Sequence, residues 1–408
     1  MNIWYMNHYA QGINHPQEGR SFFLAESINR LKDCKCTVIA SSFHHFNRNQ
    51  QEQAPKILTK NIDGVSIIWL KTPEYLGNGL KRIRNMFSYS YQCWVHDFSK
   101  LDGIEVPDVI IVSSVHPFHF LSALKWSKIY GAKLVFEVRD LWPLSLNLLL
   151  GVSKYHPFSL LLSAIERIAY RKSDLVISVL SNALSYMEPK GVNQENFLYL
   201  PNGYSTVTIN DTYNEHEEAL KKIRNKYKRI VMHTGSMGTP NGLELLVTIS
   251  NKLKDNDKIA FIFIGNGDKK DELIRASNSP HSYFFPPIPK SQLSSALKYA
   301  DICYCGSQKY LQDLYCYGVS PNKIFDYMAA SKFVLFVVDS IDTPIELAKA
   351  GVKFSPSSED DIHDFLVSSL QLEDSFFSEK GNSGKEYLIE NHYFEGLSNK
   401  LIEKLKNI

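Results

Sequence analysis

The sequence predicts an α/β protein built from two doubly wound, Rossmann-like domains. Its 408 residues, 44% of them hydrophobic and 22% charged, are too many for a single hydrophobic core. Short apolar runs alternate with amphipathic helical patterns, which is typical of parallel sheets covered by helices. A polar, charged stretch divides these runs into two series, so we expect one domain for each series.

Six apolar runs predict the strands of the first domain. Runs of this kind occur where helices cover both faces of a parallel sheet, because every side chain of the strand is then buried. The six runs are Asn2–Met6, Cys36–Ser41, Val65–Leu70, Asp108–Ser113, Lys133–Val138 and Leu175–Val179.

Four further runs predict the strands of the second domain. Helical patterns such as Gly242–Leu253 and Ser291–Tyr299 separate them, as expected of a doubly wound sheet. The four runs are Arg229–Thr234, Ile259–Ile264, Asp301–Cys305 and Phe333–Val338.

A turn and a charged stretch predict the domain boundary. The turn is Pro201–Gly203, and the stretch Asn210–Lys228 after it suits a linker. We therefore expect residues 1–203 and 204–380 to form the two domains, with a ligand cleft between the carboxyl ends of their strands. Residues 381–408 are expected to form a helix that packs back on the first domain, because five apolar residues there have helical spacing: Leu388, Phe394, Leu397, Leu401 and Leu405.

Composition excludes several classes of protein. The 45 Lys and Arg nearly balance the 43 Asp and Glu, so no global positive field favours nucleic acid as a partner. No apolar stretch reaches the roughly 20 residues of a membrane-spanning helix, and the amino end lacks the features of a signal peptide. We therefore expect a cytoplasmic location. The spacing of Cys34 and Cys36, like that of Cys303 and Cys305, favours buried thiols on one face of a strand over a zinc site.

The segment Tyr317–Lys332 carries the clearest ligand-binding pattern. Ser320 suits the N-cap of a helix and Pro321 its first position, so the free N–H groups that follow are expected to hold a phosphate. The residues of this segment expected to bind the donor are Val319, Ser320, Pro321, Asn322, Lys323 and Ile324. Lys323 adds a positive charge, and Asp326 lies one turn further on, where it can accept hydrogen bonds from ribose hydroxyls. A capped surface helix without a ligand remains the alternative.

Three glycine-bearing turns favour the same interpretation. Thr234–Gly242 follows the first strand of the second domain, and Gly235, Ser236 and Gly238 lie where the backbone must approach a bound group. Gly265 and Gly267 follow the next strand and could border a nucleobase. In the first domain, Gly19 lies in the turn Gln11–Arg20 and could approach a phosphate across the cleft. Each turn alone is weak support, because glycine follows strands in most α/β proteins.

Charged residues at strand ends suggest further site residues. Glu137-Val-Arg-Asp140 ends one predicted strand, so Arg139 and Asp140 are candidates for the cleft, and His116 follows the preceding strand. The alternatives are a histidine at the start of a helix and an internal Arg139–Asp140 ion pair. The only Asp-x-Asp, Asp255-Asn-Asp257, lies before a strand and suits a solvated turn, so no metal site is predicted.

An aromatic stripe follows the basic segment Lys81-Arg-Ile-Arg84. Ile83, Phe87, Tyr91, Trp94 and Phe98 fall at helical spacing, and we expect this stripe to pack on the sheet of the first domain. The alternative is an interfacial helix in peripheral contact with an anionic membrane over residues 81–98, with the apolar stretches 141–150 and 158–168 as further lipid-facing surface.

Four of these segments together resemble the bacterial family 4 retaining glycosyltransferases. They are Ser320-Pro-Asn-Lys-Ile-Phe-Asp-Tyr-Met-Ala-Ala330, Glu137-Val-Arg-Asp-Leu-Trp-Pro143, Gly235-Ser-Met-Gly238 and Ala40-Ser-Ser-Phe-His44. More narrowly, they are similar to the branch for O-antigen and capsule that includes N-acetyl-L-fucosamine transferases. The resemblance covers nearly the whole chain and implies a GT-B fold, a UDP-sugar donor, no metal or other cofactor, and retention of the anomeric configuration.

The resemblance also implies roles for individual residues. The amides from Ser320 to Ile324 would hold the diphosphate and Asp326 the ribose, while a histidine near His116 contacts the donor sugar or the acceptor. Relatives have Glu where this chain has Gly318, and Arg and Lys in the glycine loop where it has Thr239 and Asn241. Lys323 and Arg139 are the expected substitutes in neutralising the diphosphate.

The implied reaction moves a sugar, expected to be an N-acetylated deoxyhexosamine, from UDP to a polyprenyl-diphosphate-linked glycan bound by the first domain. Two alternatives stay open. One is a UDP-N-acetylhexosamine 2-epimerase of similar fold, and the other is a non-catalytic partner that binds a sugar nucleotide.

Overall fold

The computed structural model describes residues 1–10, 19–43, 55–77, 79–205 and 215–408. The chain folds as two compact units, and the division falls between Gly203 and Tyr204. Unit 1 is Met1–Gly203 with Phe394–Ile408, and unit 2 is Tyr204–Tyr393. Both are α/β, as the alternation of strand and helix patterns predicts. Among the helices of these described ranges, none has the length and hydropathy needed to cross a bilayer.

Unit 1 contains an eight-stranded sheet in the order β3-β4-β2-β1-β5-β6-β7-β8. All six predicted strands are present, and every neighbouring pair is parallel except β3 with β4. The sequence missed β3 and β8, which lie at the two edges. The strands are β1 (Asn2–Met6), β2 (Lys35–Ser41), β3 (Ile57–Ile62), β4 (Val65–Leu70), β5 (Val109–Ser113), β6 (Lys133–Val138), β7 (Leu175–Ser178) and β8 (Phe197–Tyr199).

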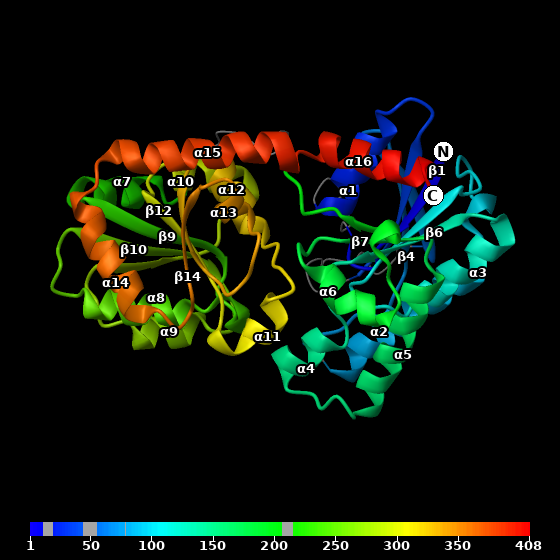
Figure 1. Cartoon of the computed structure of the whole chain (residues 1–408), viewed down its shortest axis with the longest axis horizontal. Coiled ribbons are helices and arrows are strands. Elements are labelled where there is room, and N and C mark those ends of the chain that lie inside the picture. Colours follow the sequence, from blue (N-terminus) through cyan, green and yellow to red (C-terminus); the bar gives the residue numbers. More distant parts are fainter. Residues whose placement is uncertain (11–18, 44–54, 78, 206–214) are drawn as a thin grey trace. The chain divides into compact units, whose positions relative to one another are not determined.

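Helices cover both faces of this sheet (Figure 1). On one face, α1 and α16 share a core with Tyr5 and Val38. On the other face, Phe136 packs against Phe120 of α3 and Tyr170 of α5. The helices are α1 (Arg20–Asn29), α2 (Leu80–Val95), α3 (Phe120–Tyr130), α4 (Leu144–Leu150), α5 (Pro157–Lys172), α6 (Ala183–Met187) and α16 (Phe394–Lys406).

The aromatic stripe of α2 does not pack on the sheet, so that prediction is wrong. Phe87, Tyr91 and Trp94 are 46%, 67% and 45% exposed. The helix turns its opposite side inward because polar groups there have buried partners: Asn85 donates to Thr72 Oγ1 (2.8 Å), and Tyr89 donates to the Ile39 carbonyl (2.6 Å). Phe98, the last member of the stripe, lies beyond α2 and is buried against Trp4.

Unit 2 contains a six-stranded, all-parallel sheet in the order β11-β10-β9-β12-β13-β14. The four predicted strands are its four central ones, and the sequence missed the edge strands β11 and β14. The strands are β9 (Arg229–Ser236), β10 (Ile259–Asn266), β11 (Ser282–Phe285), β12 (Ile302–Gly306), β13 (Phe333–Val337) and β14 (Gly351–Phe354).

Successive residues of these strands enter two separate cores. Met232 and Phe336 meet α7, α10, α12 and α15 on one face, while Val231 and Leu335 meet α8 and α14 on the other. The helices are α7 (Glu217–Lys226), α8 (Leu243–Lys252), α9 (Lys270–Ala276), α10 (Leu293–Leu297), α11 (Gln312–Tyr315), α12 (Asn322–Ala329), α13 (Pro344–Leu347), α14 (Glu359–Ser368) and α15 (Asp374–His392).

The end of the chain corrects the prediction of one helix over residues 381–408. The chain forms α15 and α16 with a break at Tyr393, and only the part from Phe394 onward belongs to unit 1. Leu388 lies in a core of unit 2. Gly381 allows this packing, because a β-carbon there would lie 2.0 Å from the Ser331 carbonyl oxygen.

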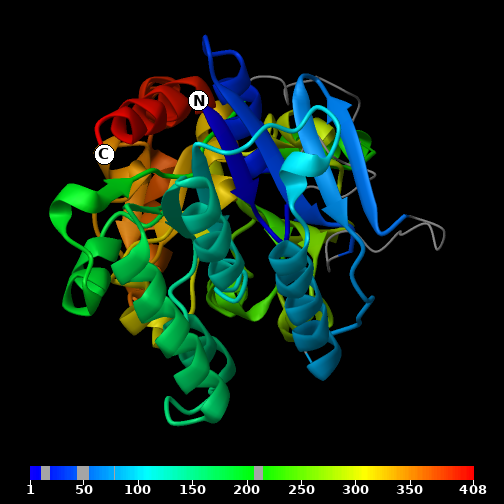
Figure 2. The same cartoon turned by 90° about the vertical axis from the view of Figure 1, so that its right-hand side faces the viewer.

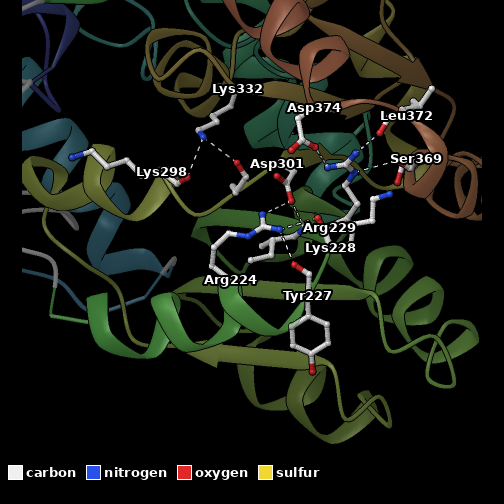
Figure 3. A network of polar contacts seen from close by, with 12 residues as sticks. Arg224, Tyr227, Lys228, Arg229, Lys298, Asp301, Lys332, Ser369, Leu372 and Asp374 are labelled. Carbon is white, nitrogen blue, oxygen red and sulfur yellow. Dashed lines mark hydrogen bonds and ion pairs between the residues drawn. The ribbon is translucent and has the colours of Figure 1, made fainter.

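A polar network ties the amino ends of the unit 2 strands together (Figure 3). The buried guanidinium of Arg229, at the start of β9, donates to the carbonyls of Ser369 (3.1 Å) and Leu372 and pairs with Asp374 at the start of α15. Asp301 accepts from Arg224 (2.6 Å) and from the Ile230 amide (2.7 Å). The network lies at the edge of the sheet opposite to the carboxyl ends of the strands.

Candidate functional site

Two glycine loops meet at the carboxyl ends of β9 and β10 in unit 2. Gly265 pairs with Gly235 and Asn266 with Ser236 in the parallel register. A β-carbon on Gly265 would lie 1.8 Å from the Gly235 carbonyl oxygen, and one on Gly267 would lie 2.5 Å from the Met237 backbone. These glycines are therefore required by the contact between the two loops, whatever ligand they border.

Lys323 extends from the first turn of α12 over the β9 loop. Its amine donates to Asn241 Oδ1 (2.5 Å), and a β-carbon on Gly235 would lie 4.0 Å from Lys323 Cε. The side chain is half-buried, and burial lowers the pKa of its amine. Within the described ranges no carboxylate pairs with Lys323. A desolvated cation without a counter-ion, beside a glycine loop, is suited to binding an anion.

The start of α12 differs from the prediction. The helix begins at Asn322, with Pro321 in extended conformation at the N-cap position, so Ser320 lies before the cap. Pro321 has no N–H, and the Ile324 amide donates to the Pro321 carbonyl (3.2 Å). Pro321 therefore has no amide to offer a phosphate, and the Ile324 amide already has an acceptor within the chain, while the binding role of residues 319–324 stays a prediction. Among the described residues, the amides of Asn322 and Lys323 have no hydrogen-bond acceptor.

Asp326 lies in a pocket of unit 2 beside this helix. The pocket holds about 380 Å³ of empty space, part of it open to solvent. The carboxyl group is 15% exposed and lies 3.5 Å from Lys290 Nζ. Burial raises its pKa, while Lys290 opposes this shift. The pocket is lined by Tyr204, Lys290, Leu293, Ser294, Leu297, Asp326, Ala329 and Ala330.

Lys323 and Asp326 are three positions apart, so they leave α12 on adjacent lines of the helix surface. The cation lies toward the glycine loop, and the carboxylate lies in the pocket. This arrangement suits a nucleotide whose phosphates reach Lys323 while a hydroxyl-bearing sugar reaches Asp326.

His233 is a site residue that the sequence analysis missed. It is buried in β9 beside Lys323, with Nε2 3.3 Å from the Ser236 carbonyl and Nδ1 3.3 Å from the Tyr304 carbonyl. Burial and the Lys323 charge hold its pKa well below the usual value, so the ring is neutral at pH 7. A neutral ring can donate to Ser236 and thereby hold the turn of the loop. Its position two residues before Gly235 was the available sequence signal.

In unit 1, His116 belongs to a buried group of aromatic side chains. Its Nε2 lies 2.6 Å from Nδ1 of His8, and the ring packs edge-on against His119. Burial, followed by the neighbouring His8, His119 and Arg82, holds the pKa of His116 well below its usual value. The histidine lies just beyond β5, as expected, and it is enclosed by its neighbours.

In the described part of unit 1, the charged residues at the end of β6 do not form the Arg139–Asp140 ion pair that was one alternative for them. Glu137 is buried and pairs with Arg20 (2.8 Å), while Tyr5 donates to its other oxygen (2.6 Å). Burial alone would raise the pKa of Glu137, but the positive charges of Arg20 and Arg139 and the Tyr5 bond hold it below the usual value. Among the described side chains, Arg139 and Asp140 form no ion pair with each other.

Gly19 caps α1 with φ of +89° and is exposed, in unit 1. The rest of its predicted turn, residues 11–18, and His44 of the fourth motif lie outside the described residues. Gly19, His116, Arg139 and Asp140 belong to unit 1, whereas the other predicted site residues belong to unit 2.

Comparison with solved structures identifies the fold. Sucrose-phosphate synthase (tll1590) of Thermosynechococcus elongatus superposes with a TM-score of 0.75 at 11% identity, covering 100% of this chain and 98% of that one. Anabaena Alr3699/HepE in complex with UDP-glucose superposes with a TM-score of 0.64 at 13% identity, covering 100% of both chains.

The fold is GT-B. At these identities the GT-B likeness concerns the fold alone. In sequence, the chain is 25% identical over 191 residues to WcaI of Escherichia coli (strain K12), which is assigned by name to colanic acid biosynthesis as a glycosyl transferase. The match covers 45% of this chain and about half (46%) of that relative's length. No model of a known protein family matches the chain.

Proposed function

We propose that this GT-B protein is a retaining glycosyltransferase that uses a UDP-sugar donor. The observation that carries the proposal is Lys323, a desolvated cation held over the glycine loop by Asn241 and adjacent to the Asp326 pocket. A diphosphate would provide the counter-ion that Lys323 lacks among the described residues. The named role of WcaI and the UDP-glucose complex of Alr3699/HepE support a sugar nucleotide as the ligand.

In the proposed reaction, a bond forms between an acceptor hydroxyl oxygen and the anomeric carbon of the sugar, while the bond from that carbon to the β-phosphate oxygen breaks. Negative charge then grows on the departing diphosphate, and Lys323 with the amides of Asn322 and Lys323 stabilises it. The same diphosphate accepts the proton of the acceptor, so no strong protein base is needed.

The narrower features remain part of the proposal. An N-acetylated deoxyhexosamine as the sugar, and a polyprenyl-diphosphate-linked glycan of O-antigen or capsule as the acceptor, follow from the resemblance in four motifs. The assignment of WcaI to a polysaccharide pathway supports this class of acceptor. Arg139 and Asp140 of unit 1 are proposed to contact the acceptor, whereas His116 is enclosed by its neighbours and is not proposed to touch a substrate.

Binding of UDP, UMP and uridine, measured by calorimetry, tests the site one group at a time. We expect Asp326→Asn to weaken all three ligands, because it alters the contact with ribose. Lys323→Gln should weaken UDP much more than uridine. Lys385→Gln, on the exposed side of α15, is the control and should change none of them.

Product analysis tests the reaction. UDP released from a UDP-sugar only when an acceptor is added supports glycosyl transfer. Isomerisation of the UDP-sugar without an acceptor would instead identify an epimerase, and binding without either product would identify a non-catalytic partner.

A further inference from the structure

The exposed apolar side chains of this protein are concentrated in unit 1. Among the described residues, fifteen of the twenty-one exposed large apolar side chains belong to unit 1. Thirteen of these lie on α2, α3, α4, α5 or the loop between α4 and α5. A surface this apolar normally contacts something other than water.

These four helices form one continuous surface. Helix α3 contacts both α2 and α5, and Figure 2 shows α2 (blue), α3 (teal) and α5 (green) in front of the sheet. Phe87 of α2 stacks on Phe118 (4.6 Å between ring centroids), which in turn contacts Phe158 of α5 (5.9 Å). Phe118 also belongs to a small core with Met86 and Leu162, and Leu146 of α4 packs against this core. We call the solvent-facing side of α2, α3, α4 and α5 the outer helix surface.

The outer helix surface is also nearly free of negative charge. Asp and Glu make up 43 of the 408 residues, yet residues 75–96, 109–136 and 141–165 contain none. These three stretches supply α2, α3, α4 and most of α5. The one carboxylate in the four helices, Glu166, is buried and paired with Lys190 (2.8 Å).

Basic residues accompany the apolar ones. Leu80, Arg84, Phe87, Tyr91 and Trp94 follow one another at helical spacing along the exposed side of α2. The Lys125 amine of α3 lies 5.1 Å from the centre of the Trp94 ring. The other basic side chains of these helices are Lys81, Arg82, Lys128, Arg167, Arg171 and Lys172.

We propose that the outer helix surface docks on an anionic lipid bilayer. Apolar and aromatic side chains would enter the boundary between headgroups and acyl chains, while the basic side chains contact lipid phosphates. Charge complementarity favours this occupant over a second copy of the chain, because two such positive surfaces would repel each other. The inference rests on the proposed function, because a lipid-linked acceptor lies in the bilayer and docking would bring the protein to it.

Flotation of the full chain with lipid vesicles tests the proposal at low salt. We expect binding to vesicles with 30% phosphatidylglycerol in phosphatidylcholine, about tenfold or more weaker binding to phosphatidylcholine alone, and release by salt. Brominated lipids should quench tryptophan fluorescence, and Trp94→Phe should remove most of that quenching.

Paired variants separate the surface from general effects. Tyr91→Ser with Leu150→Ser should weaken partitioning about tenfold or more. Ile341→Ser with Leu347→Ser is the control, because these unit 2 side chains are 50% and 54% exposed and should not contribute. Lys81→Gln with Arg84→Gln should weaken binding roughly 30-fold, whereas Lys221→Gln with Lys222→Gln on α7 should not.

Each outcome decides between distinct conclusions. Equal partitioning of the surface variants and their controls into vesicles would overturn the proposal. A dimer in solution that dissociates in the double variant Tyr91→Ser with Leu150→Ser would also overturn it. UDP binding by calorimetry, without vesicles, reports on the proposed function separately. A chain that binds UDP but not vesicles refutes the docking surface alone, and the reverse refutes the nucleotide site alone.

Discussion

Replacing Lys323 by methionine should have opposite effects on ligand binding and on stability. The amine lies over the Gly235 loop and donates a hydrogen bond to Asn241 Oδ1. Deleting a charged hydrogen bond to a diphosphate costs about 2–4 kcal/mol, so the dissociation constant of UDP should rise about 30- to 1,000-fold. Uridine, which lacks phosphate, should bind within about twofold of the parent protein.

The ligand-free variant should be more stable than the parent. Burial lowers the pKa of Lys323, so the folded protein destabilises the ammonium form at neutral pH. Methionine removes this cost, and we expect about 1 kcal/mol more stability and a melting temperature roughly 2–4 °C higher. In the parent alone, stability should rise with pH from the lowered folded-state pKa toward the ordinary value of 10.5.

Calorimetric titration with UDP and uridine, and thermal unfolding without ligand, measure both effects. Unchanged UDP affinity, or an equal loss for UDP and uridine, would refute the phosphate role of Lys323. A variant that loses both stability and UDP affinity would show that the amine stabilises the fold and does not serve mainly to bind an anion.

Three further predictions concern the scaffold. Gly265→Ala should destabilise unit 2 by about 3 kcal/mol or more in a denaturant titration, because its β-carbon would lie 1.8 Å from the Gly235 carbonyl oxygen. The control is Gly396→Ala on α16, where a β-carbon would have nothing within 4 Å. This variant should be neutral or stabilising in the same titration. Arg229→Met should lower the free energy of unfolding by about 2–3 kcal/mol, since the Ser369 and Leu372 carbonyls lose their donor, while the folded fraction keeps its UDP affinity. His119→Gln should make stability less sensitive to acid. Burial lowers the pKa of His119 to about 4, so below pH 6.5 the unfolded chain binds a proton that the folded chain does not bind. In the parent this difference lowers the free energy of unfolding by about 2 kcal/mol at pH 5. An unchanged slope of stability against pH between 7 and 5 would contradict that assignment.

The central strands could be predicted because burial on both faces makes them continuously apolar. Strand β10, for example, is buried along its whole length except at Asn266. Edge strands lack this pattern: Thr59, Lys60 and Asn61 of β3 are exposed, and β8 has three residues. Their pairing depends on neighbours that are distant in sequence, so local periodicity did not reveal them.

The error at α2 has a different origin. Periodicity shows that one side of a helix is apolar, but it does not show which side is buried. The inner side of α2 was decided by Asn85 and Tyr89, whose partners Thr72 and Ile39 belong to other elements. The same inner side also buries Met86 and Cys93.

The helix that carries Lys323 and Asp326 was predicted, whereas the roles of these residues toward a ligand stay predictions. The pattern of Pro321, Lys323 and Asp326 indicated the start of a helix, and the structure adds that Lys323 reaches Asn241 while Asp326 lines the pocket. The capping details were wrong because Pro321 adopts an extended conformation. His233 was missed because its one sequence signal, a position two residues before Gly235, does not show that the ring contacts the loop.

The near-contact of Gly265 with Gly235 has a practical consequence for engineering. Gly265 cannot be replaced alone, since a β-carbon there would collide with the Gly235 carbonyl oxygen, whereas a β-carbon on Gly235 would have only Lys323 Cε nearby, at 4.0 Å. A segment transplanted from a homologue at the carboxyl end of β10 must therefore keep glycine at position 265.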